Sequence, residues 1–161
     1  MVLRFRVQES SLIEAPADLV YNLIADYKQH HGNIIPPAMF GGMKVVKGSG
    51  VGNGTRIACT FRILGKEDTL IMDVSELKGG NGERIIQEID SKARNITQFI
   101  VEEESSDTCK VTICTDVMRQ EGWIAGAIDQ FVCTAIMKSW YKKELVQLNE
   151  YAQTLQRDGK E

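Results

Sequence analysis

Apolar and polar residues alternate along much of this chain, and that alternation predicts β-strands with one buried face. The pattern is clearest in residues 55–63, where Ile57, Cys59 and Phe61 share one side and arginines occupy the other. The segments that we interpret as strands are residues 2–13, 43–46, 55–63, 68–77, 84–89, 96–101 and 109–117. Short turns rich in glycine, asparagine and serine separate them, so we expect an antiparallel sheet of six to seven strands.

Residues 16–27 predict a short helix after the first strand. Pro16 suits the first turn of this helix, and apolar residues recur along one face at helical spacing. A second short helix or a turn is expected at residues 34–40, where Pro36-Pro37 interrupts the segment.

Residues 119–157 contain no proline and predict one long C-terminal helix. Its second half is amphipathic, because Tyr141, Leu145 and Leu148 recur at the spacing of one helical face. Glu144 belongs to the charged residues that we assign to the opposite face. The first half is apolar nearly all round, so we expect the sheet to bury it nearly all round.

The order of these elements predicts an α+β fold in a single domain, residues 1–161. An antiparallel sheet with one apolar face must cover that face, and the C-terminal helix is the element long enough to do so. We therefore expect a curved sheet wrapped round this helix, with two short helices after the first strand that roof a gap. Gly122 and Gly126 in the helix fit either a close crossing of the sheet or room for a cavity.

The amino-acid composition and charge disfavour several classes of function. The net charge of −3 and the lack of a basic block disfavour nucleic-acid binding. No apolar run approaches the ~20 residues of a membrane span, and residues 1–8 alternate like a strand rather than a signal peptide. The cysteines show no CxxC spacing, so we expect reduced, buried thiols in a cytoplasmic protein with no metal and no cofactor. They are Cys59, Cys109, Cys114 and Cys133.

Three features have both a structural and a chemical interpretation. The glycine-rich residues 48–54 could cradle a phosphate, but they lack the Gly-Lys-Ser/Thr ending of a P-loop and precede a strand, which favours a plain hairpin loop. His30 and His31 could act as a general base, although no partner can be assigned and histidine is common at a helix end. Tyr27 could direct its hydroxyl into a pocket or belong to the core, and Thr115 is another polar candidate on an apolar face.

Two short motifs resemble a known superfamily. Ile13-Glu14-Ala15-Pro16, followed by Val20-Tyr21 and Asp26-Tyr27, is similar to the start of START-like or Bet v 1-like (SRPBCC) proteins. Residues 50–56 resemble the G-V-G-T-R turn of the polyketide cyclase/dehydrase branch, enlarged here by Asn53 and Gly54. With the long final helix, the resemblance covers essentially the whole chain.

The resemblance implies a helix-grip fold with an apolar pocket between the sheet and the long helix. It implies binding of a small hydrophobic ligand that is lipid-, quinone- or polyketide-like. The alternatives are a polyketide cyclase or dehydratase in the same pocket and, less favoured, a chaperone-activator-like interaction module. Either a monomer or a homodimer fits the sequence. The residues that we expect to line the pocket are Tyr27, Phe40, Ile57, Cys59, Phe61, Met72, Phe99, Val111, Ile113, Ile124, Ile128, Phe131 and Val132.

Overall fold

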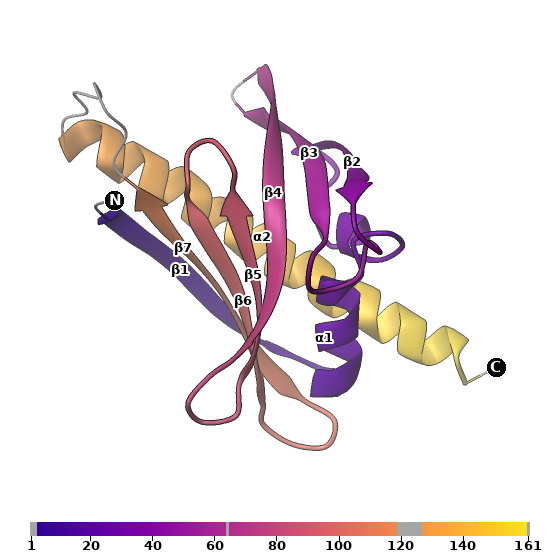
Figure 1. Cartoon of the computed structure of the whole chain (residues 1–161). Helices are drawn as coiled ribbons and strands as arrows, with labels where there is room; N and C mark the ends of the chain where they lie inside the picture. The colour runs from indigo at the N-terminus through magenta and orange to yellow at the C-terminus, as the bar shows by residue number, and fades with distance from the viewer. Residues whose placement is uncertain (1–2, 64, 119–126, 161) are drawn as a thin grey trace.

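The computed structural model of the chain describes residues 3–63, 65–118 and 127–160, and the side chains of residues 63 and 127–129 lie outside this description. Its elements follow one another along the chain in the order strand, helix, strands and long helix (Figure 1). They are β1 (Leu3–Ile13), α1 (Ala17–Ala25), the 3₁₀ turn η1 (His31–Asn33), β2 (Phe40–Lys47), β3 (Arg56–Ile63), β4 (Lys66–Lys78), β5 (Arg84–Asp90), β6 (Ile96–Glu103), β7 (Cys109–Met118) and α2 (Ala127–Asp158).

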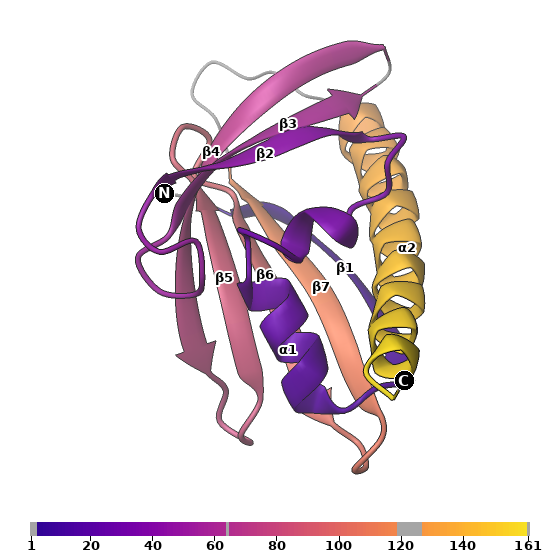
Figure 2. The same ribbon diagram turned by 90° about the vertical axis from the view of Figure 1, so that its right-hand side faces the viewer.

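The strands form a seven-stranded antiparallel sheet in the order β1-β7-β6-β5-β4-β3-β2. Strands β2 to β7 pair with their neighbours in sequence, as short turns between alternating segments require, and β1 pairs with β7. Figure 2 shows that the sheet is strongly curved and that α1 and α2 lie on its concave side. The predicted helix-grip architecture is therefore confirmed.

The second helix of the predicted roof is shorter than expected and comes earlier. A single 3₁₀ turn, η1, occupies His31–Asn33. The proline pair that follows forms a turn, in which the Met39 amide donates to the Pro36 carbonyl at 3.0 Å. Proline lacks an amide hydrogen and restricts the residue before it, which is why the segment does not continue as a helix.

The C-terminal half of α2 is buried as its amphipathic pattern predicts, but the prediction for the N-terminal half is wrong. Phe131 is 77% exposed and Val132 is 46% exposed. Within the described residues of this half, Cys133, Met137 and Trp140 pack against the core and form a single stripe. The sheet covers one side of the helix there rather than wrapping it. Residues 119–126, which include Gly122, Ile124 and Gly126, lie outside the described residues.

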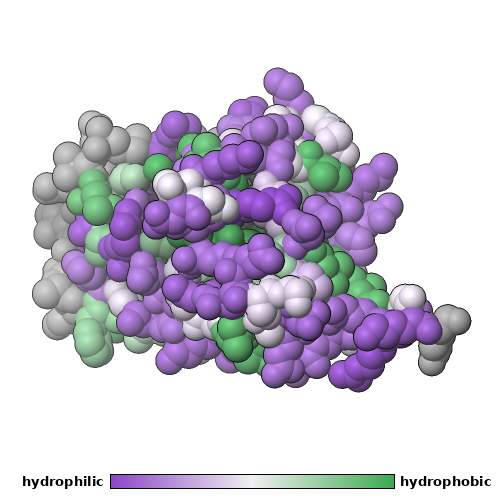
Figure 3. Space-filling view, turned by 90° about the horizontal axis from the view of Figure 1, so that it is seen from below, coloured by the Kyte–Doolittle hydropathy of each residue, from purple (hydrophilic) through white to green (hydrophobic). Residues whose placement is uncertain are grey.

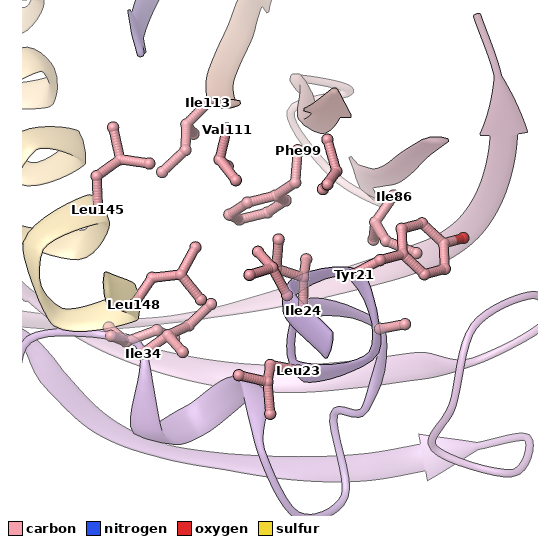
Figure 4. Packing of buried hydrophobic residues seen from close by; sticks show 14 of the residues in the cluster. Tyr21, Leu23, Ile24, Ile34, Ile86, Phe99, Val111, Ile113, Leu145 and Leu148 are labelled. Carbon is pink, nitrogen blue, oxygen red and sulfur yellow. The ribbon is translucent and has the colours of Figure 1, made fainter. Parts of the chain in front are cut away.

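The hydrophobic core lies between α1, the concave face of the sheet and the C-terminal half of α2 (Figure 4). Ile24 from α1, Ile86 and Ile113 from the sheet and Leu148 from α2 are almost completely buried. The side of the molecule shown in Figure 3, seen from below relative to Figure 1, is mainly hydrophilic, with its apolar residues in small separate patches. None of the helices in the described part of the chain is long and apolar enough to cross a membrane.

Candidate functional site

A cavity of about 180 Å³ lies between the concave face of the sheet and α2. It is slightly larger than the roughly 150 Å³ cavity that binds benzene inside a protein core. Strands β2 to β7 each contribute side chains to its wall, and η1 and α2 complete it. The cavity thus lies at the position that the sequence predicts for a pocket.

Part of the predicted lining is found at this cavity. The predicted residues that line it are Cys59, Phe61, Met72, Phe99 and Ile113. Each lies on the inward face of its strand. For Cys59, Phe61, Met72 and Ile113, this is the face that the alternation of apolar residues predicts. Further apolar lining residues that were not predicted are Ile35, Met43, Leu70, Met137 and Trp140.

The other predicted lining residues lie elsewhere. Tyr27, Ile57 and Val111 are buried in the core beside the cavity, and Phe40 is only partly buried and packs against that core. The exposed Phe131 and Val132 do not line the cavity, because α2 turns a different stripe toward the sheet. Ile124 and the side chain of Ile128 lie outside the described residues.

One end of the cavity is polar, and Glu88 on β5 is at its centre. The Glu88 side chain is only 7% exposed, and its Oε1 accepts a hydrogen bond of 2.7 Å from the Tyr27 hydroxyl. Burial raises the pKa of Glu88 to about 7, and the bond from Tyr27 offsets only part of that effect. The sequence did not identify Glu88 because Ile85, Ile86 and Ile89 put apolar residues on both faces of its strand.

His31 lies beside Glu88 and is held from three directions. Its Nδ1 donates to the Ile24 carbonyl at 2.6 Å, because a carbonyl oxygen can only accept. Its ring stacks on Tyr27 with the centroids 4.2 Å apart and meets the Phe99 ring edge-on at 5.3 Å. Burial lowers the pKa of His31 to about 4, so the 3.6 Å approach of Nε2 to Glu88 is not an ion pair at neutral pH.

Glu144 on α2 brings a second carboxyl group to the cavity. Burial, followed by the nearby charge of Glu88, raises the pKa of Glu144 to about 8. The sequence pattern places Glu144 on the polar face of the helix, and the structure corrects this prediction. The spacing carried a signal, since Glu144 lies four residues after Trp140 and four before Leu148, two positions that pack inward.

The remaining polar lining groups make hydrogen bonds within the protein. Thr97 and Thr115 join their hydroxyls at 2.8 Å, and Thr115 in turn makes a short hydrogen bond to the Tyr141 hydroxyl. Asp90 Oδ1 accepts the backbone amides of residues 92 and 93 at 2.8 and 3.0 Å. Asn95 Oδ1 accepts the backbone amide of residue 118 at 2.9 Å. These bonds hold the wall of the cavity in place.

The glycine-rich loop supports the site from outside. It clamps the end of α1, since the Tyr27 amide donates to the Gly50 carbonyl at 2.8 Å and the Gly52 amide donates to the Ala25 carbonyl at 3.0 Å. The amides of Asn53 and Gly54 also donate to protein acceptors, the Glu76 carboxylate and the Val74 carbonyl. These amides are used inside the protein, which supports the plain-loop interpretation over a phosphate cradle.

His30 and the cysteines add no catalytic group to the polar end of the cavity. His30 Nδ1 is 2.8 Å from the Tyr151 hydroxyl and connects the η1 segment to α2. All four cysteines are free, and burial raises the pKa of Cys59 to about 12. The described residues contain no group of three or more metal-ligating side chains that could hold an ion.

Several solved structures share this arrangement. The solution structure of the KanY protein (ms6282) superposes with a TM-score of 0.75 at 18% sequence identity, covering 95% of this chain and 99% of that one. A START superfamily protein from Mycobacterium smegmatis gives a TM-score of 0.70 at 13% identity, covering 93% and 98% of the two chains. The Zhui aromatase/cyclase from Streptomyces sp. R1128 gives 0.72 at 14% identity, covering 92% and 93%.

Sequence comparison alone does not reach these proteins. No family model matches the sequence, and no curated protein is significantly similar to it. The shared architecture extends over nearly the whole length of both chains, and the motifs at residues 13–27 and 50–56 agree with it. The chain has the START-like, Bet v 1-like (SRPBCC) fold.

Proposed function

We propose that this protein binds a compact, mainly apolar small molecule in the cavity between the sheet and α2. The observation that carries the proposal is the cavity of about 180 Å³ whose wall is built largely from aliphatic and aromatic side chains. Apolar surface removed from water contributes about 25 cal/mol per Å², so an aromatic ring that buries roughly 150 Å² gains about 4 kcal/mol. The fold shared with START-like structures supports this function, because it leaves this space between sheet and helix.

The size of the cavity favours one kind of ligand among those implied by the sequence. A volume close to that of the benzene-binding cavity suits one or two fused rings. A lipid with two acyl chains would need the sheet and α2 to move apart. We therefore favour a quinone-like or small polyketide-like ring compound over a two-chain lipid.

A matched pair of variants on β4 tests the proposal. Leu70 lines the cavity, whereas the neighbouring Thr69 is exposed. Leu70→Trp should fill part of the cavity and weaken binding of a fused-ring compound such as naphthoquinone by roughly 10-fold or more, whereas Thr69→Trp should leave it unchanged. Isothermal titration calorimetry measures both. Equal affinities of the two variants, or no binding of ring compounds by the wild-type protein, would contradict the proposed function.

Proton-transfer catalysis on a bound ring compound is a second candidate, favoured by one observation. Glu88 and Glu144 have pKa values near neutrality in an apolar cavity, next to a neutral His31. A general acid or base works best when its pKa is near the working pH. If the protein is such an enzyme, Glu88→Gln should lower turnover of a reactive polyketide mimic by roughly 10²–10⁴-fold while the affinity of an unreactive ring compound is kept.

A further inference from the structure

The polar end of the cavity offers hydrogen-bond acceptors that the protein does not use. Glu88 Oε2 has no hydrogen-bond partner among the described residues, although the side chain is only 7% exposed. The Glu144 carboxyl group makes neither a hydrogen bond nor an ion pair with any residue that the structure describes. Both side chains line the cavity. The one fully enclosed side-chain polar atom without a partner in the described part of the chain is Thr55 Oγ1. The free oxygens of Glu88 and of the partly buried Glu144 therefore face the cavity space, where a ligand can supply the donor.

No positively charged side chain of the described residues lines the cavity beside these groups. The described lining residues include three carboxylates, Glu88, Asp90 and Glu144, but no lysine and no arginine. Asp90 is held by backbone amides, and His31 donates its Nδ1 hydrogen to the Ile24 carbonyl. The two free carboxyl groups are therefore left for the occupant of the cavity.

We propose that the ligand is a compact ring compound that carries a basic nitrogen, and that Glu88 and Glu144 together hold its ammonium group. This inference rests on the proposed binding function and specifies the chemistry of the ligand. Hydrogen bonds from an ammonium group to a carboxylate are charge-assisted and are stronger than those between neutral groups. The apolar wall, with Phe61, Phe99 and Trp140 among its residues, takes the ring.

Charge also decides which ligands are excluded. Two ionised carboxylates at one end of an apolar cavity repel each other, and a cation placed between them removes that cost. A carboxylate or phosphate ligand would add a further negative charge with no lysine or arginine in the described wall to neutralise it. The pocket should thus rank an amine above a neutral alcohol of the same shape, and the alcohol above the corresponding acid.

Binding of a cation should depend on pH in a defined direction. Because the pKa values of Glu88 and Glu144 are raised to about 7 and about 8, both groups are largely protonated near pH 6, and the ammonium group must displace those protons. The other titratable groups that face the pair are Tyr27, His31, Cys59, Asp90 and Tyr141. Burial keeps His31 neutral in this range and raises the pKa of the tyrosines and of Cys59. Amine affinity should rise from about pH 6 to about pH 8, and alcohol affinity should stay constant.

Three compounds of one shape test the inference on the whole chain: aminoindane, indanol and indane carboxylate. Calorimetry near pH 8 should give the amine an affinity roughly 10- to 100-fold above that of the alcohol, the value expected for a charged hydrogen bond. If the alcohol binds as tightly as the amine, or the acid binds best, the inference is overturned and the proposed pocket stands. If none of the three binds, both the inference and the proposed binding of compact ring compounds are overturned.

Variants of the two carboxyl groups assign the effect to this site. Glu144→Gln and the double variant Glu88→Gln/Glu144→Gln should reduce the preference for aminoindane over indanol by roughly 10-fold or more. Indanol binding should persist in both, which shows that the pocket is intact. Glu150→Gln, an exposed change on the same helix, is the matched control and should keep the wild-type preference. If the double variant loses indanol binding, Glu144→Gln alone decides, since its carboxyl has no hydrogen bond to lose among the described residues. An unchanged preference in Glu144→Gln would overturn the inference.

Discussion

Glu88 and Glu144 make the stability of the folded protein depend on pH. Their carboxyl pKa values rise from 4.5 to about 7 and about 8, so between these values the folded state binds more protons than the unfolded state. Stability should then fall as pH rises. His31 acts in the opposite direction, since its pKa falls from 6.5 to about 4, but only below about pH 6.5. The effect of the carboxyl groups is therefore isolated from about pH 6.5 to about pH 8.

We expect the free energy of unfolding of the wild-type protein to decrease across that window. The free energy of unfolding of the double variant Glu88→Gln/Glu144→Gln should be nearly independent of pH there, because both carboxyl groups with a raised pKa have been removed. Above pH 8 it should be more stable than the wild-type protein by something on the order of 2 kcal/mol. Glutamine at position 88 keeps an acceptor for the Tyr27 hydroxyl. Urea denaturation at a series of pH values measures this, and a flat wild-type profile would contradict it.

The residues of the site differ in how far sequence could predict them. Cys59, Phe61, Met72 and Ile113 were predictable because a strand with one apolar face shows its inward positions by alternation. Glu88 was not, since β5 carries isoleucine on both faces and its orientation follows from pairing with β4 and β6. Glu144 was missed because a charged residue beside an apolar stripe is usually solvated, and only the curvature of the sheet brings it to the cavity.

At the scale of the elements, the glycine-rich loop contains two positions that should respond differently to an added side chain. Gly52 has φ = +59°, and an added Cβ would lie 2.4 Å from Glu76 Oε2. Gly54 also has a positive φ, +79°, but an added Cβ would meet nothing within 4 Å. The two positions share backbone strain and differ in the steric contact with Glu76.

Gly52→Ala should therefore destabilise the protein more than Gly54→Ala. The left-handed conformation alone costs a non-glycine residue roughly 1–2 kcal/mol, which is the expected effect at position 54. At position 52 the displaced Glu76 also loses its bonds to the Asn53 amide and the Tyr21 hydroxyl, so we expect roughly 3 kcal/mol or more. Denaturant titration of both variants compares them, and equal losses would show that the contact with Glu76 is unimportant.

Helix α2 provides the second test at this scale, because its two halves differ in burial. Leu148 is 1% exposed and packs in the core, so Leu148→Ala should cost roughly 2–5 kcal/mol. Phe131, which the sequence analysis expected to be buried, is exposed. Phe131→Ala should therefore change the free energy of unfolding by less than about 0.5 kcal/mol. Thermal and urea unfolding of the two variants distinguish them. A large loss in Phe131→Ala would mean that this half of the helix is covered after all.

At the scale of the whole molecule, the sequence predicted which segments form the sheet and that a long helix lies against it. Alternation and turn chemistry are local, so they were sufficient for the strands and their antiparallel order. The extent of wrapping was not predictable, because it depends on the twist accumulated over seven strands. For the same reason the helix leaves Phe131 exposed and the cavity stays near 180 Å³.

Thiol accessibility tests this arrangement of sheet and helix in a single experiment. Cys59, Cys109 and Cys114 are buried in the sheet, whereas Cys133 on α2 is partly exposed. Burial also raises the pKa of the Cys59 thiol to about 12 and that of Cys109 to about 11, which lowers the fraction of reactive thiolate. In the native protein, Ellman's reagent should therefore modify one thiol quickly and the other three much more slowly. Cys133→Ser should abolish the fast phase, and denaturant should make all four thiols react quickly.

Because Cys59 forms part of the cavity wall, its slow reaction reports how often the sheet and α2 separate, and a bound ring compound should slow it further. Fast modification of two or more thiols in the native Cys133→Ser variant would mean that the sheet and α2 open far more readily than this packing allows.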